Sequence, residues 1–219
     1  MKKVIIIGAS GMIGSLVLKH CLDSEEIGEV LSLVRRPSGI EHPKLSEIRL
    51  DDFSEYGQKG LNLNNIDAAF CCIGVYTGAV PKDVFRQITT DYPVAFARAV
   101  HEQSPDATFC LLSGAGADRS ERSRMMFARD KGAAENRISD LGFEAFHTFR
   151  PGYIYPVEKR KEPNFGYRFY RFLYPLIRRI GTNSSITSTE LAQAMFNVGL
   201  HGARKEELEN RDILGYVQQ

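Results

Sequence analysis

Residues 1–14 read MKKVIIIGASGMIG, and this stretch decides the fold. A short apolar run at 4–7, rich in β-branched residues, is followed by Gly8, Gly11 and Gly14 at three-residue spacing and then by helical periodicity. This order of strand, glycine-rich turn and helix is how a dinucleotide-binding α/β domain begins. The apolar run is too short for the hydrophobic region of a secretion signal, so we interpret it as the first strand.

Each glycine of the turn has its own expected task. Gly8 lets the chain leave the strand sharply, because a residue without Cβ can adopt a positive φ. Gly11 removes a side chain where the backbone approaches a pyrophosphate, and Gly14 lets the new helix lie close to the sheet. The helix N-terminus offers unpaired N–H groups to the phosphates, and Ser10 adds a hydroxyl donor. An ordinary βα turn is the alternative interpretation.

Composition limits the class of protein. The chain has 219 residues, a length typical of one α/β domain, and 43% hydrophobic residues supply a sizeable core. The net charge of +1 argues against a general nucleic-acid binder, and no apolar run is long enough to predict a transmembrane segment. The histidines and cysteines show no metal-ligand spacing, so we expect no metal, buried free thiols and a cytoplasmic location. The cysteines are Cys21, Cys71, Cys72 and Cys110.

Strand-like and helix-like segments alternate along the chain. We expect further strands at 29–34, 45–50, 66–73, 107–112 and 143–149, and helices at 83–101, 120–141 and 188–200. This alternation predicts a Rossmann-type, doubly wound parallel sheet with helices on both faces, in a single domain over residues 1–219. Pro93 is expected to kink or split its helix, and Thr187 or Ser188 to cap the last one. Residues 153–183 depart from the pattern, and we expect a lid or substrate-side segment there.

The end of the second strand bears on the choice of cofactor. An acidic residue there binds the ribose 2′-hydroxyl of NAD, whereas arginine accommodates the 2′-phosphate of NADP. Arg35 and Arg36 stand at this end, and guanidinium groups form charge-assisted bonds to phosphate. The sequence therefore favours NADP, with Arg35 ahead of Arg36, and two solvated surface arginines are the alternative. Asp52, after the third strand, is placed to meet adenine, although a loop aspartate more often caps a turn.

Five motifs occur in order along the chain. They are GASGMIG at 8–14, LVRRP at 33–37, FCCIG at 70–74, LLSGAGAD at 111–118 and FRPGYIY at 149–155. Together they resemble the atypical short-chain dehydrogenase/reductases, an NAD(P)-binding Rossmann family. Within that family the likeness is to the Tat-interacting oxidoreductase-like branch and its bacterial relatives. Many families share the glycine motif, whereas FCCIG followed by LLSGAGAD is more specific.

The resemblance implies a role for each matching position. The glycine turn would hold the pyrophosphate, and the loop beyond the sixth strand would lie near the nicotinamide amide. Ser113 would polarise a substrate carbonyl, and Lys131 would contact the nicotinamide ribose. The positions implied to bind cofactor are Gly8, Ser10, Gly11, Met12, Ile13, Arg35, Cys72, Ile73, Gly74, Lys131, Pro151 and Gly152.

The chain departs from the family at one catalytic position. Phe127 stands four residues before Lys131, where the family has a tyrosine that acts as general acid. A phenyl ring cannot donate a proton to a carbonyl that becomes an alkoxide. Three explanations stay open: NADP binding without reduction, another acid, or a substrate that needs no enzymic proton at that point. Tyr153 is our candidate for another acid, with Tyr76 and Tyr155 as further candidates.

A basic and aromatic segment at 159–179 combines seven Lys/Arg with six Tyr/Phe and one acid. Such a segment binds a membrane surface or an anionic partner, or it covers the substrate, and we favour the lid. The sequence therefore predicts an NADP-dependent oxidoreductase acting on an unknown small carbonyl or related substrate. The alternative is a non-catalytic NADP-binding regulator or sensor that docks a protein partner. Whether the chain forms a homodimer stays open.

Overall fold

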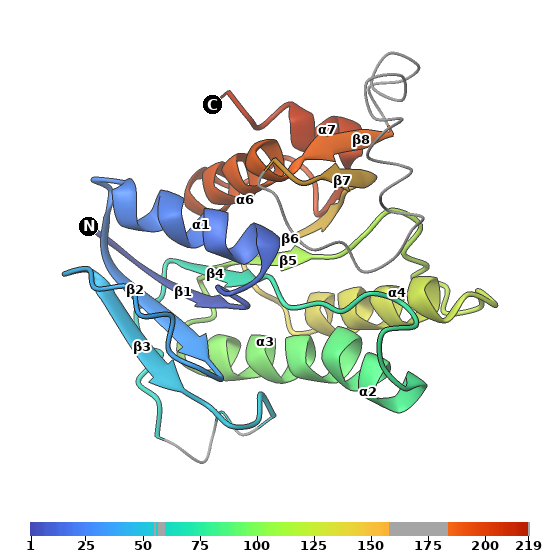
Figure 1. The fold of residues 1–219 in the computed structure, drawn as a ribbon, viewed down its shortest axis with the longest axis horizontal. Helices are drawn as coiled ribbons and strands as arrows, with labels where there is room; N and C mark the ends of the chain where they lie inside the picture. The colour runs from blue at the N-terminus through green and yellow to red at the C-terminus, as the bar shows by residue number, and fades with distance from the viewer. Residues whose placement is uncertain (55, 57–59, 158–183, 219) are drawn as a thin grey trace.

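A seven-stranded parallel sheet forms the centre of the molecule (Figure 1). The computed structural model describes residues 1–54, 56, 60–157 and 184–218. The strand order is β3-β2-β1-β4-β5-β6-β9, which confirms the expected Rossmann-type α/β fold. The strands are β1 (Lys2–Ile7), β2 (Ile27–Val34), β3 (Leu45–Arg49), β4 (Ala68–Cys71), β5 (Thr108–Leu112), β6 (Ala145–Arg150) and β9 (Glu207–Glu209).

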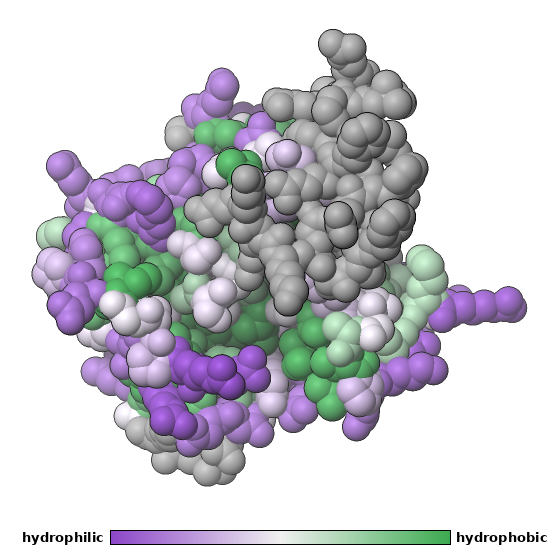
Figure 2. Space-filling model, in the orientation of Figure 1, coloured by the Kyte–Doolittle hydropathy of each residue, from purple (hydrophilic) through white to green (hydrophobic). Residues whose placement is uncertain are grey.

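Both faces of β1 are covered by helices, which is why its apolar run is continuous. Residues 4–7 are fully buried. Alternate residues of this run face α1 (Met12–Asp23) and α6 (Ser188–His201) on one side and α3 (Tyr92–Gln103) on the other. The order of strands reverses between β1 and β4, and dinucleotides bind at such a switch point in open α/β sheets. Figure 2 shows hydrophobic side chains gathered across the middle of the face that is seen in Figure 1, with hydrophilic side chains towards its rims.

The long helix expected at 83–101 is split, as Pro93 predicted. The order is α2 (Lys82–Arg86), a π-helical turn η2 (Gln87–Asp91) and then α3. Pro93 lies in the first turn of α3, directly after the wide turn. Because proline has no backbone N–H, the regular hydrogen-bond ladder cannot run unbroken through this point.

The helix expected at 120–141 begins later, so that prediction was wrong at its N-terminal end. The helix is α4 (Met126–Ser139). Before it, the carboxylate of Asp118 accepts hydrogen bonds from the backbone N–H groups of Ser120, Arg122 and Ser123. These bonds offer the backbone an alternative to the helical ladder and keep the stretch in a loop.

Four short elements after β6 were not expected. β7 (Tyr153–Tyr155) pairs in parallel with β8 (Ser185–Thr187) in a second sheet, and α7 (Asn210–Leu214) follows β9. Strands of three residues carry too little alternation to be recognised in a sequence. Of the segment 153–183, only its first residues are described, and the basic and aromatic segment 159–179 lies outside the described residues.

Local predictions at the cap of α6 and at the cysteines are confirmed. The hydroxyl of Thr187 accepts a hydrogen bond from the Glu190 N–H at 3.1 Å, and the Glu190 carboxylate accepts one from the Thr187 N–H at 2.9 Å. This reciprocal pair is a capping box. All four cysteines are free and buried. Every helix within the described ranges is too short or too polar to cross a bilayer.

Candidate functional site

The glycine turn after β1 has a backbone that only glycine fits. Gly8 has a φ of +83°, and a Cβ built on it would lie 2.6 Å from the carbonyl carbon of Cys72. A Cβ on Gly14 would lie 2.1 Å from the carbonyl oxygen of Gly8. Contacts this short do not occur for real Cβ atoms. Gly8 and Gly14 therefore have the sharp turn and the close helix approach that the motif predicted.

The N-terminus of α1 is open to an anion. Gly11 is its N-cap, without a capping side chain, and the first turn carries no acidic residue. The N–H of Gly11 donates to the carbonyl oxygen of Gly8 at 2.9 Å, which closes the turn below the helix. The N–H groups at Met12 and Ile13 begin the helix and lack an intrahelical partner, and such groups attract phosphate.

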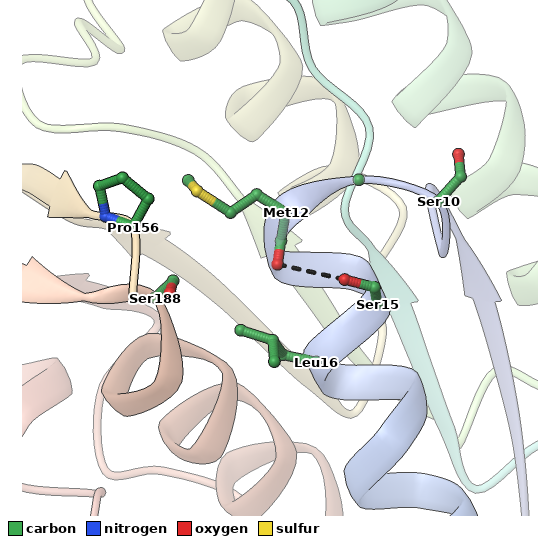
Figure 3. A pocket seen from close by; sticks show the side chains of 7 residues that line it. Ser10, Met12, Ser15, Leu16, Pro156 and Ser188 are labelled. Carbon is green, nitrogen blue, oxygen red and sulfur yellow. Dashed lines mark hydrogen bonds between the residues drawn. The ribbon is translucent and has the colours of Figure 1, made fainter. Parts of the chain in front are cut away.

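A cavity of about 160 Å³ lies beside this helix N-terminus (Figure 3). In Figure 3 the side chain of Met12 extends towards Pro156, whereas that of Ser10 points away from them. The volume is below the range of about 300–1,000 Å³ that is typical of ligand sites, so this cavity by itself does not enclose a dinucleotide. The lining residues are Ser10, Gly11, Met12, Ser15, Leu16, Pro156 and Ser188.

The residues predicted to choose the cofactor lie where β2 and β3 end. Arg35 and Arg36 follow β2 directly and are exposed. Asp52 caps its own turn, because its Oδ1 accepts hydrogen bonds from the N–H and the hydroxyl of Ser54, both at 2.8 Å. These bonds hold the pKa of Asp52 below its ordinary value. Tyr92 of α3 also reaches this carboxylate, a contact that the sequence did not suggest.

The stretch after β4 runs beside the glycine turn. The N–H of Cys72 donates to the carbonyl oxygen of Ile7 at 3.0 Å, and Ile73 and Gly74 continue from there. Burial raises the pKa of the Cys71 thiol to about 12 and places that of Cys72 well above its ordinary value. Thiols in this state are not nucleophiles, so the Cys71-Cys72 pair belongs to the core.

Three residues spaced by four along α4 lie against the end of β5. A Cβ built on Gly114 would lie 2.8 Å from Cζ of Phe127, so the ring rests where Gly114 has no side chain. The ammonium of Lys131 donates to the carbonyl oxygen of the last residue of β5 at 3.0 Å. The carboxylate of Glu135 accepts a hydrogen bond from the hydroxyl of Ser113 at 2.5 Å. Residues at this spacing share one helix face, and here that face meets the strand end.

The side chain of Lys131 is nearly buried, and only part of its hydrogen-bonding capacity is taken up by the protein. Its exposed fraction is 9%, and burial lowers the pKa of its ammonium below the ordinary value. An ammonium has three N–H donors, and one of them reaches the end of β5. The remaining donors suit the hydroxyl groups of a ribose, which is the role that the resemblance implied.

Glu135 is fully buried at the centre of a charged network. It accepts five hydrogen bonds, from Ser113, Thr148 and Arg119 and twice from Arg150. Burial alone would raise the pKa of Glu135, but the hydrogen bonds of Arg150 and Ser113 and the charge of Arg150 outweigh it and hold the pKa below its ordinary value. The two arginines continue to the glutamates at 206, 207 and 209.

Sequence reasoning missed this network. The spacing of Lys131 and Glu135 was a visible signal, because it places both on one face of a helix. Arg150 lies inside the FRPGYIY motif, yet nothing local tied it to α4.

The loop after β6 lies beside the loop after β5. The carbonyl oxygen of Pro151 accepts a hydrogen bond from the Ala115 N–H at 3.0 Å. Gly152 is confined as well, because a Cβ on it would lie 2.5 Å from the carbonyl oxygen of Ser184. Tyr153 follows on β7 and is half-buried. Ser113, Lys131 and Pro151 are therefore brought to one edge of the sheet.

Comparisons with known proteins agree with this architecture. No family model matches the chain. Protein HTATIP2 of Rattus norvegicus is 27% identical over 217 residues, which cover 97% of this chain and 88% of that protein. The mitochondrial protein fmp52-2 of Aspergillus terreus is 29% identical over 168 residues, covering 75% and 72%. The resemblance to the Tat-interacting branch is confirmed by the first of these relatives.

Solved structures show the same fold at low identity. The enzyme WbmH of Bordetella bronchiseptica, in complex with NAD+, matches with a TM-score of 0.67 and 16% identity, covering 94% of this chain and 74% of that chain. A putative NAD-dependent epimerase/dehydratase from Bacillus halodurans matches with a TM-score of 0.66 and 17% identity, covering 94% and 92%.

Proposed function

We propose that this chain, a relative of the atypical short-chain dehydrogenase/reductases, binds NADP(H) across the carboxyl ends of its parallel strands. The observation that carries the proposal is the turn in which Gly8 and Gly14 bring the N-terminus of α1 against the sheet at its switch point. A backbone without Cβ and a helix N-terminus together suit a pyrophosphate. The complex of WbmH with NAD+ supports a nicotinamide dinucleotide as the ligand.

The 2′-phosphate of NADP is the group that Arg35 and Arg36 suit best. Both are exposed beyond β2, and residues 35–40 contain no acidic residue for the 2′-hydroxyl of NAD. We expect NADPH to bind at least tenfold more tightly than NADH, which is about 1.4 kcal/mol. Calorimetric titration with NADPH and with NADH measures this difference in affinity. Arg35→Ala should lose the preference for NADPH, whereas Arg204→Ala, a change at another exposed arginine, should keep it. Equal affinities in the unaltered chain would refute the NADP assignment.

The geometry favours a binding protein over a conventional carbonyl reductase. Phe127 has no proton to give, and the single hydroxyl proton of Ser113 is donated to Glu135. Two of the three groups of the usual catalytic set are therefore unable to polarise a carbonyl. A regulator or sensor that binds NADP(H) and docks a protein partner needs neither of them.

An NADP(H)-dependent oxidoreductase acting on a small, partly apolar substrate is the second candidate. Lys131 keeps N–H donors for the ribose, and Tyr153 is a phenol close to the end of β6. Oxidation of NADPH against a panel of carbonyl compounds and quinones separates the two candidates. Turnover by the unaltered chain that is lost in Tyr153→Phe supports the enzyme. Tight NADPH binding without turnover, with activity gained in Phe127→Tyr but not in Phe127→Leu, supports the binding protein.

The place of action that we propose is the cytoplasm, because four buried free thiols suit a reducing compartment. The fmp52-2 relative is named as mitochondrial, so the mitochondrion is the alternative location. Fractionation of the source cells with an antibody to the chain tests the proposal.

A further inference from the structure

We infer that Ser113 accepts a hydrogen bond from a ligand hydroxyl group, and that Glu135 is the positioning residue that fixes Ser113 in this role. The inference rests on the proposed binding of NADP(H). Two ligands would supply such a hydroxyl under the proposed function: an alcohol substrate beside the nicotinamide, or the ribose of the dinucleotide itself.

The direction of one hydrogen bond carries the inference. The hydroxyl of Ser113 lies 2.5 Å from Oε1 of Glu135, which is held as a carboxylate by Arg150 and Arg119. A carboxylate has no proton, so Ser113 is the donor in this bond. A serine hydroxyl has a single proton, and only its lone pairs remain for a ligand. A hydroxyl group can donate to those lone pairs, whereas a carbonyl group cannot.

A ligand carbonyl does not displace this bond. Hydrogen bonds to an ionised carboxylate are shorter and about twice as strong as those to a neutral acceptor. Glu135 itself is held in place, because Thr148, Arg119 and Arg150 also donate to it and its side chain is fully buried. Ser113 would have to give up its bond to an ionised carboxylate to serve a neutral ketone oxygen.

The surroundings of Ser113 complete a pattern that suits a hydroxyl. Lys131 donates to the carbonyl oxygen of Leu112, the residue before Ser113, and has further N–H groups to give. A hydroxyl group can both accept a hydrogen bond, as from an ammonium, and donate one, as to Ser113, whereas a ketone can only accept. The ring of Phe127, lying on Gly114, adds an apolar surface beside them. The alcohol that fits is therefore one with an apolar body.

Dead-end complexes test the inference, because no hydride can move in them. The probes are NADPH alone, 1-phenylethanol on the NADPH-loaded protein and acetophenone on the NADP+-loaded protein, each titrated calorimetrically. We expect Ser113→Ala to lower the affinity for the hydroxyl-bearing ligand up to about tenfold and to leave the affinity for acetophenone unchanged. A loss for NADPH identifies the ribose as the source of the hydroxyl, and a loss for 1-phenylethanol alone identifies an alcohol. Ser32→Ala, which removes a buried serine hydroxyl in β2 away from Glu135, is the matched control and should change neither ligand.

Glu135→Gln gives a result that a merely structural role would not produce. Oε2 of Glu135 accepts from two guanidinium groups and Oε1 from one, so the glutamine oxygen takes the Oε2 position and its NH2 faces Ser113, at the cost of the bond from Nε of Arg150. The hydroxyl of Ser113 then turns to accept and its proton becomes free for the ligand. Acetophenone should bind more tightly in this variant, while the hydroxyl-bearing ligand should bind more weakly.

Two results would overturn the inference. One is a weaker affinity for acetophenone in Ser113→Ala. The other is an unchanged affinity for NADPH in Ser113→Ala, if 1-phenylethanol also binds with unchanged affinity or does not bind at all. Circular dichroism checks the fold of each variant, and Ser113→Ala decides alone if Glu135→Gln does not fold. Failure of the unaltered chain to bind NADPH would refute the proposed function instead.

Discussion

Replacing Arg150 by methionine tests how far the buried Glu135 depends on its guanidinium partner. Arg150 is 8% exposed and supplies two of the five hydrogen bonds that Glu135 accepts. Methionine keeps most of the length and removes the charge. Removing one partner of a buried ion pair costs about 3–5 kcal/mol where the other charge loses its main partner, and here Glu135 keeps only Arg119 as a salt-bridge partner among the described residues. We expect a loss of this size in the free energy of unfolding at neutral pH.

The loss should shrink as the pH falls. In the native chain the pKa of Glu135 is below its ordinary value of 4.5, so its stabilising contribution is present above that pH and is lost on acidification. In Arg150→Met the cost of burying the charge of Glu135 is less well compensated, so burial raises the pKa of Glu135. Protonation then removes this buried charge and with it part of the destabilisation of the folded variant. The two stability curves should therefore approach each other from neutral pH towards 4.5.

Urea unfolding followed by circular dichroism measures both effects, since the chain has no tryptophan to report by fluorescence. Arg137→Met is the matched control. Arg137 lies 3.9 Å from Asp91 at the surface, and such a pair contributes about 0–1 kcal/mol. A loss below about 1 kcal/mol for Arg150→Met, or a loss that does not change with pH, would refute this account of the network.

Three further changes probe the turn, the sheet and the last long helix. Gly14→Ala should lower both the melting temperature and the affinity for NADPH, because its Cβ would lie 2.1 Å from the Gly8 carbonyl oxygen. As the control, Gly74→Ala should leave the melting temperature unchanged, because a Cβ there meets no atom within 4 Å. Burial lowers the pKa of His147, so stability should fall as the pH drops below 6.5, and His147→Phe should flatten that slope in urea titrations. Thr187→Ala breaks the capping box of α6 and should cost about 1 kcal/mol in the same assay, and a change within error would contradict the role of the cap.

Much of the fold was predictable because its signals are local. The apolar run at 4–7, the glycine spacing and Pro93 are each visible within a few residues of sequence, and the strand, the tight turn and the split helix that they predicted are present in the structure. The start of α4 was not predictable in this way, because the bonds that Asp118 makes to the following loop compete with the helix. The strands β7, β8 and β9 are too short to show a period, and they depend on contacts distant in the sequence, namely pairing with another strand and burial of Ile186 and Leu208 in the core.

The residues of the candidate site likewise divide into those with a local sequence signal and those placed by contacts distant in the sequence. Ser113 and Lys131 were recognised because they lie within, or at a fixed distance from, motifs that resemble a known family. Glu135 was missed, although it controls the hydroxyl of Ser113 from 22 residues away. Thr148 and Arg150 reach the same carboxylate from β6, 13 and 15 residues away. Asp52 lies beyond the end of β3, and its bond to Ser54 is the turn-capping role that the sequence offered as the alternative to adenine binding.

The sequence by itself determined the strand, turn and helix that begin the chain, and it determined that position 127 has no proton to donate. Both follow from covalent structure, since glycine lacks Cβ and phenylalanine lacks a hydroxyl. Only the tertiary structure decided the direction of the hydrogen bond at Ser113. A hydroxyl donates or accepts according to the charge of its neighbour, and folding alone brings an ionised Glu135, with its two arginines, to within 2.5 Å.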